Sequence, residues 1–171
     1  MYVYVYVRVL LQLAMELEIA VDKAALEMGY TSLRQKQKDA ILGFLRGRDV
    51  FVSLPTGSGK SLCYAILPRV FDTLRGKSSK SIAIVVSPLI SLMKDQVHSL
   101  EAKGVSSIYV TKNGISDSQE QMTYEGEYQI MFFSPEALIC DDTWREMIQS
   151  KVYQDNVIAF VVDEAHLVKK W

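Results

Sequence analysis

The sequence contains few residues of the kinds that form metal sites or disulfide frameworks: two cysteines and two histidines in 171 residues. Cys63 and Cys140 stand far apart, with no CxxC pair and no histidine-rich neighbourhood, so a zinc site is not expected. Two isolated cysteines suit a reducing compartment. A chain of this length can bury enough apolar surface to fold without such cross-links.

A long uninterrupted apolar run is also lacking. The apolar start, Met1 to Ala14, is about half the length that a membrane span requires, and it contains Arg8. Glu16 and Glu18 follow where a secretory signal would have a small-residue cleavage site. Neither a membrane partner nor secretion is therefore expected. The Tyr-Val alternation from Tyr2 to Val7 has the period of a strand, although a terminal segment can equally be frayed.

An excess of charge of either sign is absent, because 19 Lys and Arg stand against 20 Asp and Glu. The formal net charge is −1, so binding of a polyanion must come from a local patch and not from overall charge. Hydrophobic residues make up 49% of the chain, which excludes a disordered or fibrous protein. The composition predicts an ordinary globular domain.

Segments with strand and helix patterns alternate along the chain. Strands are expected at 49–54, 81–87, 107–111, 129–133 and 157–162. Helices are expected at about 14–28, 34–46, 60–74, 90–103 and 142–150. This alternation predicts an α/β fold with a parallel sheet covered by helices in three layers. Such sheets bind ligands at the carboxyl ends of their strands.

A glycine-containing turn joins the first expected strand to the helix that begins near residue 60. It consists of Pro55, Thr56, Gly57, Ser58, Gly59, Lys60 and Ser61. Glycines let the backbone curl so that successive N–H groups point at phosphate oxygens. Lys60 would reach the β and γ phosphates of ATP, and the Ser61 hydroxyl would bind Mg²⁺. The strict phosphate-loop pattern has a glycine where Leu54 stands, so the general motif is missed by one residue.

Two adjacent carboxylates, Asp163 and Glu164, follow the apolar run 157–162, and His166 comes two residues later. The carboxyl end of a strand is where a nucleotide-hydrolysing site needs a carboxylate for Mg²⁺ and another for the attacking water. Together with the upstream glycine turn, this DEAH segment predicts nucleotide hydrolysis, with Lys60, Asp163, Glu164 and His166 as the catalytic set.

Several segments resemble the motifs of RecQ-family DNA helicases, in the same order and at compatible spacing. They are Gly29-Tyr30 with Arg34 and Gln37, PTGSGKSLCY (55–64), VVSPLISLMKDQV (85–97), FFSPEAL (132–138) and VVDEAHLVKKW (161–171). SLCY and SPLISLMKDQV discriminate best, because RNA helicases of the DEAD and DEAH groups differ there. The resemblance covers residues 29–171 and implies the first of two RecA-like P-loop domains. It also implies ATP-driven 3′ to 5′ unwinding of DNA, with roles in repair and recombination.

The resemblance assigns roles to residues of this chain. Tyr30 would stack on adenine, while Arg34 and Gln37 would hold the adenine edge. An amide can pair bidentately with adenine, so the chemistry suits Gln37. The turns at the carboxyl ends of two strands would lie along the DNA backbone and contact it independently of sequence. They comprise Ser87, Pro88 and Leu89, then Ser134, Pro135 and Glu136, with the aromatic Trp171 as a further nucleic-acid residue.

The sequence departs from the family pattern in three places. Gln35 and Lys36 stand where the family usually has Pro-Gly. Residues 167–170 are Leu-Val-Lys-Lys, where a small residue and a Ser-Gln pair are usual before the tryptophan. The sequence stops at Trp171, before the second RecA-like domain and its arginine finger, which in phosphoryl transfer accelerates hydrolysis by about 10³ to 10⁵. We therefore expect nucleotide binding that greatly exceeds turnover.

The leading hypothesis is the ATP-binding half of a RecQ-like helicase, with residues 1–28 as an N-terminal apolar segment and helix and 29–171 as the helicase domain. ATP and Mg²⁺ are the expected cofactors, and single-stranded DNA, duplex junctions and a second RecA-like domain are the expected partners. The expected location is the nucleus, or the cytoplasm in a prokaryote. A non-catalytic nucleotide- or DNA-binding module and an RNA helicase half are the alternatives.

Overall fold

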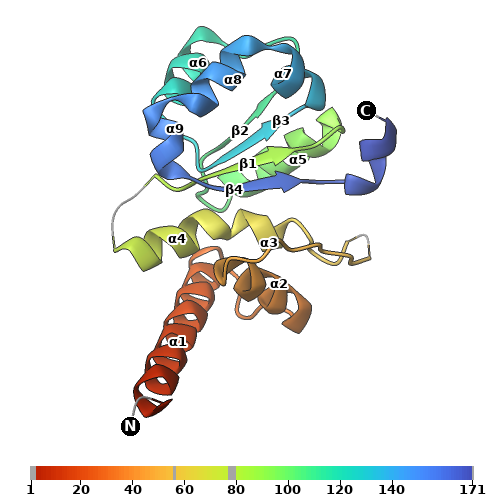
Figure 1. Cartoon of the computed structure of the whole chain (residues 1–171). Coiled ribbons are helices and arrows are strands. Elements are labelled where there is room, and N and C mark those ends of the chain that lie inside the picture. The colour runs from red at the N-terminus through yellow and green to blue at the C-terminus, as the bar shows by residue number, and fades with distance from the viewer. Residues whose placement is uncertain (1–2, 56, 77–79, 171) are drawn as a thin grey trace. The chain divides into compact units, whose positions relative to one another are not determined.

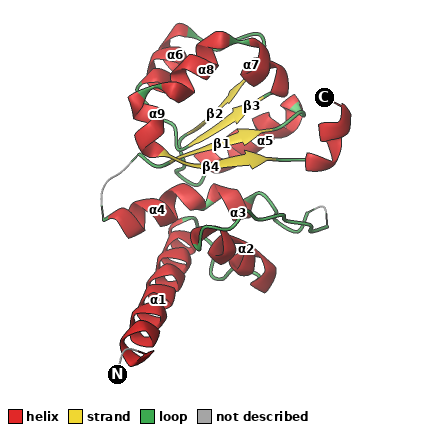
Figure 2. Ribbon diagram, viewed as in Figure 1, coloured by secondary structure: helices red, strands yellow, loops and turns green. Residues whose placement is uncertain are grey.

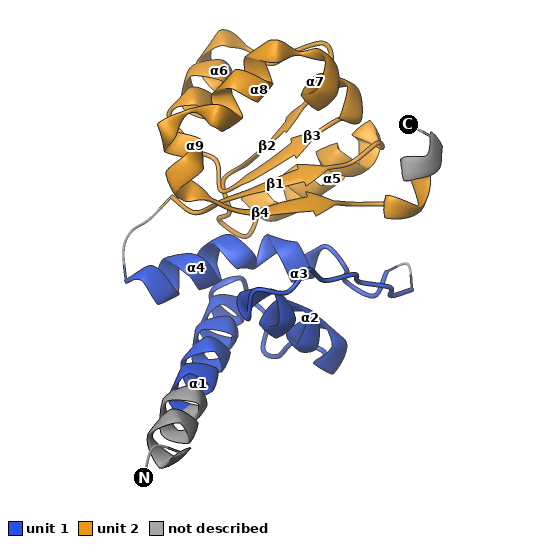
Figure 3. Cartoon of the chain, viewed as in Figure 1, with its two compact units in different colours: residues 1–77 blue, residues 78–171 orange. Residues whose placement is uncertain are grey.

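The chain divides into two compact units, residues 1–77 and residues 78–171 (Figure 3). The structure, a computed structural model, describes residues 3–55, 57–76 and 80–170. The domain boundary expected between residues 28 and 29 stays a prediction, because the region that resembles helicases extends over both units.

The first unit is helical in its described residues. Its elements are α1 (Val3–Glu27), α2 (Gln35–Leu45), α3 (Leu62–Ala65) and α4 (Leu67–Arg75) (Figure 1). α1 packs against α2 and α4, and it does so through side chains at helical spacing, which include the buried Leu17, Val21 and Ala24. Among the residues searched, no helix combines the length and the apolar content that crossing a membrane requires.

Two predictions for this unit are only partly right. The expected helix 60–74 is split into α3 and α4 at Ile66. Pro68 explains the break, since it has no N–H to donate to the carbonyl of Tyr64 four residues earlier. The strand period at Tyr2 to Val7 proves misleading, because α1 already begins at Val3; Tyr2 lies outside the described residues.

The strand expected at 49–54 is wrong: this segment is an extended loop, and Phe51 within it is 84% exposed. A strand needs a neighbouring strand to receive its backbone hydrogen bonds. In the part of the chain that the structure describes, all strands lie in the second unit, so the segment has no such partner in its own unit.

The second unit contains a parallel sheet. Its strands are β1 (Ile82–Val86), β2 (Ser107–Val110), β3 (Ile130–Phe133) and β4 (Val157–Val162) (Figure 2). The spatial order is β2-β3-β1-β4, and every neighbouring pair is parallel. β1 and β3 are central and nearly all their residues are buried, as expected for strands covered on both faces. The four later strand predictions are thus confirmed.

Helices cover both faces of this sheet. α5 (Ile90–Glu101) lies on one face, where the Ser107 hydroxyl of β2 donates to the Val97 carbonyl and the Lys94 ammonium lies over the ring of Tyr109. The other face carries α6 (Asp117–Tyr124), α7 (Pro135–Cys140), α8 (Asp142–Gln149) and α9 (Lys151–Asn156) (Figure 1). The expected α/β fold with a parallel sheet in three layers is confirmed.

The main core lies between the sheet and this second group of helices. Its side chains come from alternate strand positions and from α7, α8 and α9, and they include Ile84, Met131, Phe133, Trp144 and Tyr153. The rings of Phe133 and Trp144 meet edge to face at 5.9 Å. Alternate side chains of each of these strands therefore face this core, as the two-residue period of a strand requires.

Three helices of the second unit were not predicted, namely α6, α7 and α9. α6 lies in the polar stretch after β2, where no apolar period indicates a helix. Its start is nevertheless marked by a capping box, in which the Ser116 and Gln119 side chains bond each other's backbone N–H groups. Ser134 similarly caps α7, because its hydroxyl accepts from the N–H of Ala137.

Tyr153 joins α9 to α6 inside the core. Its hydroxyl donates to the Thr123 carbonyl at 2.6 Å, and the side chain is fully buried. Burial raises the pKa of Tyr153 well above its ordinary value, so the phenol stays protonated as a donor.

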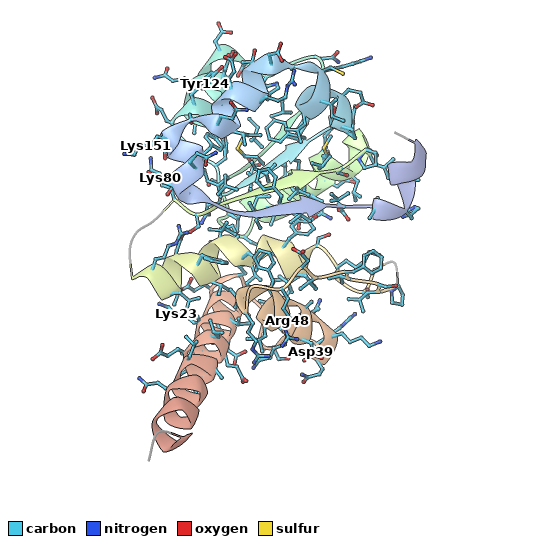
Figure 4. The ribbon with its side chains drawn as sticks, in the orientation of Figure 1. Lys23, Asp39, Arg48, Lys80, Tyr124 and Lys151 are labelled. Atoms are coloured by element: carbon cyan, nitrogen blue, oxygen red, sulfur yellow. The ribbon has the colours of Figure 1, made fainter. Side chains whose placement is uncertain are left out.

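We expect Tyr153→Phe to lower the free energy of unfolding by about 1 kcal/mol, because it deletes one buried hydrogen bond while the Thr123 carbonyl keeps its bond from the N–H of Gly126. Urea unfolding measures this as a lower midpoint with an unchanged slope. Tyr124→Phe is the matched control, since Tyr124 lies on the same unit's α6 and is 43% exposed (Figure 4). Equal midpoints for the two variants would contradict a role for the Tyr153 hydroxyl.

Candidate nucleotide-binding site

The glycine turn between residues 55 and 61 adopts a curled backbone in the first unit. Gly57 and Gly59 have φ angles of 75° and 79°, in the left-handed region that favours glycine. The N–H and the hydroxyl of Ser58 both donate to the Pro55 carbonyl, which closes the turn. Thr56, an expected nucleotide-binding residue, lies outside the described residues.

Lys60 folds back over this turn. Its ammonium donates to the Leu54 carbonyl at 3.1 Å, and the side chain is half-buried. Ser61 follows directly and precedes the first residue of α3. The ammonium and the hydroxyl therefore stand in the same turn as the two glycines, as the sequence predicts for a phosphate loop.

Arg34 and Gln37 also reach this turn, from the start of α2. The Gln37 amide nitrogen donates to the carbonyls of Ser58 at 3.3 Å and Gly59 at 2.9 Å. The Arg34 guanidinium donates to the Ser58 carbonyl at 2.9 Å. Gln37 is only 4% exposed, and its amide oxygen accepts from the N–H of Arg34. The structure thus places both residues against the loop backbone, while their contact with adenine stays a prediction.

Tyr30 follows the end of α1 at a glycine-terminated cap. The N–H of Tyr30 donates to the Ala25 carbonyl and that of Gly29 donates to the Leu26 carbonyl. Gly29 has a φ of 82°. This pattern is the Schellman motif, which only a residue that tolerates left-handed φ completes without strain. The cap fixes the backbone position of Tyr30, which is half-buried, relative to the end of α1. Its stacking on adenine stays a prediction.

The DEAH segment lies in the second unit, at the carboxyl end of β4. The N–H of Asp163 donates to the Val86 carbonyl at 2.9 Å, which ties the segment to the end of β1. The Asp163 carboxylate in turn accepts from the N–H of Glu164 at 2.9 Å. Residues 165–170 then form a 3₁₀ helix. Sheet pairing therefore fixes the backbone of this segment up to its first carboxylate.

Glu164 has a φ of 50°, which makes it a non-glycine residue in the left-handed region. Its carboxylate lies 3.2 Å from Nδ1 of His166. The Glu164 side chain is 25% exposed and that of His166 is 70% exposed. Left-handed backbone at a residue with a Cβ costs about 1 to 3 kcal/mol, and such strain gathers at functional sites.

The turns expected to contact DNA follow β1 and β3 in the second unit. Ser87 and Ser134 are both buried. The Ser134 hydroxyl caps α7, and that of Ser87 has no hydrogen-bond partner among the described residues. Pro135 is buried, Pro88 is half-buried, and Leu89 and Glu136 are exposed. Contact of these turns with DNA stays a prediction, and Trp171 lies outside the described residues.

The predicted site residues therefore fall into two groups. The loop, Arg34 and Gln37 are gathered in the first unit, and the DEAH segment stands in the second. Within the described residues, no group of three or more His, Cys, Asp or Glu side chains is placed to hold a metal ion. The carbonyl groups of Leu54, Pro55, Ser58 and Gly59 also act as hydrogen-bond acceptors. Residue types do not predict these contacts, because every residue has the same backbone carbonyl.

Comparison with known proteins identifies the family. The model of the DEAD/DEAH box helicase family matches residues 34–171. The ATP-dependent DNA helicase RecQ of Haemophilus influenzae is 35% identical over 146 residues, which are 84% of this chain and 22% of that protein. The ATP-dependent helicase SGS1 of Saccharomyces cerevisiae is 38% identical over 142 residues, 81% of this chain and 10% of that protein.

A further relative is the probable ATP-dependent DNA helicase RecS of Bacillus subtilis, 34% identical over 145 residues, 84% of this chain and 27% of that protein. The chain thus spans about a tenth to a quarter of the length of these relatives. The parallel sheet flanked by helices agrees with the RecA-like fold that the motifs imply. The chain belongs to the DEAD/DEAH box helicase family, and within it to the RecQ group.

Proposed function

We propose that this chain binds ATP through the loop 55–61 and is the ATP-binding half of a RecQ-like helicase that unwinds DNA in the 3′ to 5′ direction. The observation that carries the proposal is the loop itself: two left-handed glycines, a lysine ammonium over the turn and carbonyl oxygens held by donors. The names of the relatives, which are ATP-dependent DNA helicases, support it.

The loop residues suit a polyphosphate. The ammonium of Lys60 now bonds the Leu54 carbonyl, and a phosphate oxygen would compete for it as a charged and therefore stronger acceptor. Curled backbone around Gly57 and Gly59 presents N–H groups to an anion. The lysine and the loop amides together would neutralise the β and γ phosphates.

Magnesium fits the oxygen donors that the chain offers. Ser61 and Asp163 are the proposed ligands, a hydroxyl and a carboxylate, both of the type that Mg²⁺ prefers. When bound, the ion would neutralise charge on the phosphates of ATP. The hydrogen bond from the N–H of Asp163 to the Val86 carbonyl fixes the backbone at Asp163, which would favour this role.

Glu164 is the proposed base that orients or deprotonates the attacking water. Its backbone is left-handed soon after β4 has ended, and its carboxylate lies 3.2 Å from Nδ1 of His166. A carboxylate that accepts the proton of water contributes about 10² to 10⁴ to the rate of such reactions. His166, which lies in the 3₁₀ helix 165–170, would position the Glu164 carboxylate.

DNA is the proposed nucleic-acid partner, through the turns 87–89 and 134–136. The second RecA-like domain expected from the family would complete both hydrolysis and unwinding. Activity on duplex junctions and a role in repair and recombination, in the nucleus or in a bacterial cytoplasm, belong to this proposal for the whole protein.

Replacing Lys60 by alanine tests the loop directly. Lys60→Ala removes a charge-assisted contact worth about 1.5 to 3 kcal/mol, so the affinity for Mg²⁺·ATP is expected to fall tenfold or more. Isothermal titration calorimetry measures the change. Lys36→Ala is the matched control, since Lys36 is an exposed lysine of α2 in the same unit. An unchanged affinity for Lys60→Ala would remove the loop from the ATP site.

Binding of single-stranded DNA to this chain is expected to be weak and only mildly dependent on salt. The turns 87–89 and 134–136 contain no Lys or Arg, and the net charge is −1. Each neutralised phosphate contributes about −0.7 to the slope of log K against log salt, so we expect a slope no steeper than roughly −2. Fluorescence anisotropy of a labelled oligonucleotide over a salt series measures it, and a steep slope with tight binding would refute this reading of the turns.

A further inference from the structure

Four carbonyl oxygens in and beside the phosphate loop, those of Leu54, Pro55, Ser58 and Gly59, accept hydrogen bonds from side chains. The carbonyl of Leu54 accepts from Lys60, and that of Pro55 accepts from the Ser58 hydroxyl. The carbonyl of Ser58 accepts from both Arg34 and Gln37, and that of Gly59 accepts from Gln37 and from the N–H of Leu62. Gln37 is thus the side chain that donates hydrogen bonds to two successive peptide groups of the loop.

A held carbonyl fixes the direction of the N–H in the same peptide group. In a planar trans peptide the C=O and the following N–H point in opposite directions. The carbonyls of Ser58 and Gly59 point to Gln37, so the N–H groups of Gly59 and Lys60 point away from it. Among the described residues, none accepts a hydrogen bond from either of these N–H groups. They are therefore available to an anion on the side of the loop opposite Gln37.

The Gln37 amide is fully engaged in this arrangement. Its nitrogen makes two bonds to the loop, and its oxygen accepts from the N–H of Arg34. Bidentate pairing with adenine would need the same nitrogen and oxygen at once. Contact is also close, because a Cβ placed on Gly59 would lie 2.7 Å from the Gln37 amide nitrogen. Gln37 cannot hold the loop and read a base edge in the same conformation.

We propose that Gln37 is a positioning residue for the phosphates: it orients the N–H groups of Gly59 and Lys60 toward the anion by holding the loop carbonyls. This inference rests on the proposed function in one respect, namely that the loop binds phosphate. Arg34 also holds the Ser58 carbonyl, through one bond from its guanidinium. Loss of the bonds from Gln37 weakens binding of a polyphosphate whether or not a base is attached.

The test compares two ligands, Mg²⁺·ATP and inorganic tripolyphosphate, by calorimetric titration of the full chain. Gln37→Glu keeps the size of the side chain and the oxygen that accepts from the N–H of Arg34, so this bond at the start of α2 survives. It removes the donor and sets a carboxylate against two carbonyl oxygens. We expect both ligands to lose affinity tenfold or more, and by similar factors.

The matched control is Gln35→Glu. Gln35 lies on the same helix and is exposed, and its amide nitrogen donates to Asp39 and not to the loop. This variant adds the same charge two residues away, and we expect less than a twofold change for either ligand. Gln37→Met, which keeps the length without charge, serves as a second variant if circular dichroism shows that Gln37→Glu is unfolded, with the same expected loss for both ligands.

Weaker ATP binding with unchanged tripolyphosphate binding in a folded Gln37 variant would overturn the inference, since it would make Gln37 a reader of the base alone. Unchanged binding of both ligands would overturn it as well. Failure of the proposed function has a different signature, because the unsubstituted chain would then bind neither ligand.

Discussion

The shape of the phosphate loop depends on hydrogen bonds to its carbonyl oxygens. A glycine-rich turn is conformationally free by itself, and ordering it costs more backbone entropy than ordering other residues. Here two donors from the start of α2 and one from the loop's own lysine offset that cost. Because Gln37 is the third residue of α2 and its amide oxygen accepts from the N–H of Arg34, the start of one helix also determines the conformation of the loop. Helix formation and site formation are therefore coupled within the first unit.

In the second unit, sheet pairing fixes the backbone at the start of the DEAH segment. β4 lies beside β1 in parallel register, and the last bond of that ladder is the one from the N–H of Asp163 to the Val86 carbonyl. The regular backbone stops there, and Glu164 adopts its left-handed conformation one residue later. Pairing with β1 thus fixes the backbone as far as Asp163. The strained residue, Glu164, is the first one beyond this pairing.

Strands β1 and β3 were predictable because continuous apolar runs such as 82–86 mark strands buried on both faces. β4 was predictable from an apolar run of the same kind, although its Phe160 and Val162 are exposed. α6 was missed because its polar sequence has no apolar period, and its local signals were limited to its two ends, a capping box at Ser116 and Gly126 after its last turn. The segment 49–54 has the composition of a strand, but composition does not supply a neighbour for pairing. For the candidate site, the motifs predict a role for the residues of the loop and of the DEAH segment, and this role stays a prediction. The contacts of Gln37 were not predictable, because its partners are backbone atoms 21 and 22 residues further along.

The central claim is that the backbone amides of this loop bind the phosphates of ATP. Hydrogen–deuterium exchange of the full chain, with and without saturating Mg²⁺·ATP, tests it most directly because it observes those amides themselves. The account predicts slower exchange on ATP addition in peptides that cover residues 57–61, with no change in peptides that cover α6. Equal exchange at residues 57–61 in the presence and absence of saturating ATP would contradict the account.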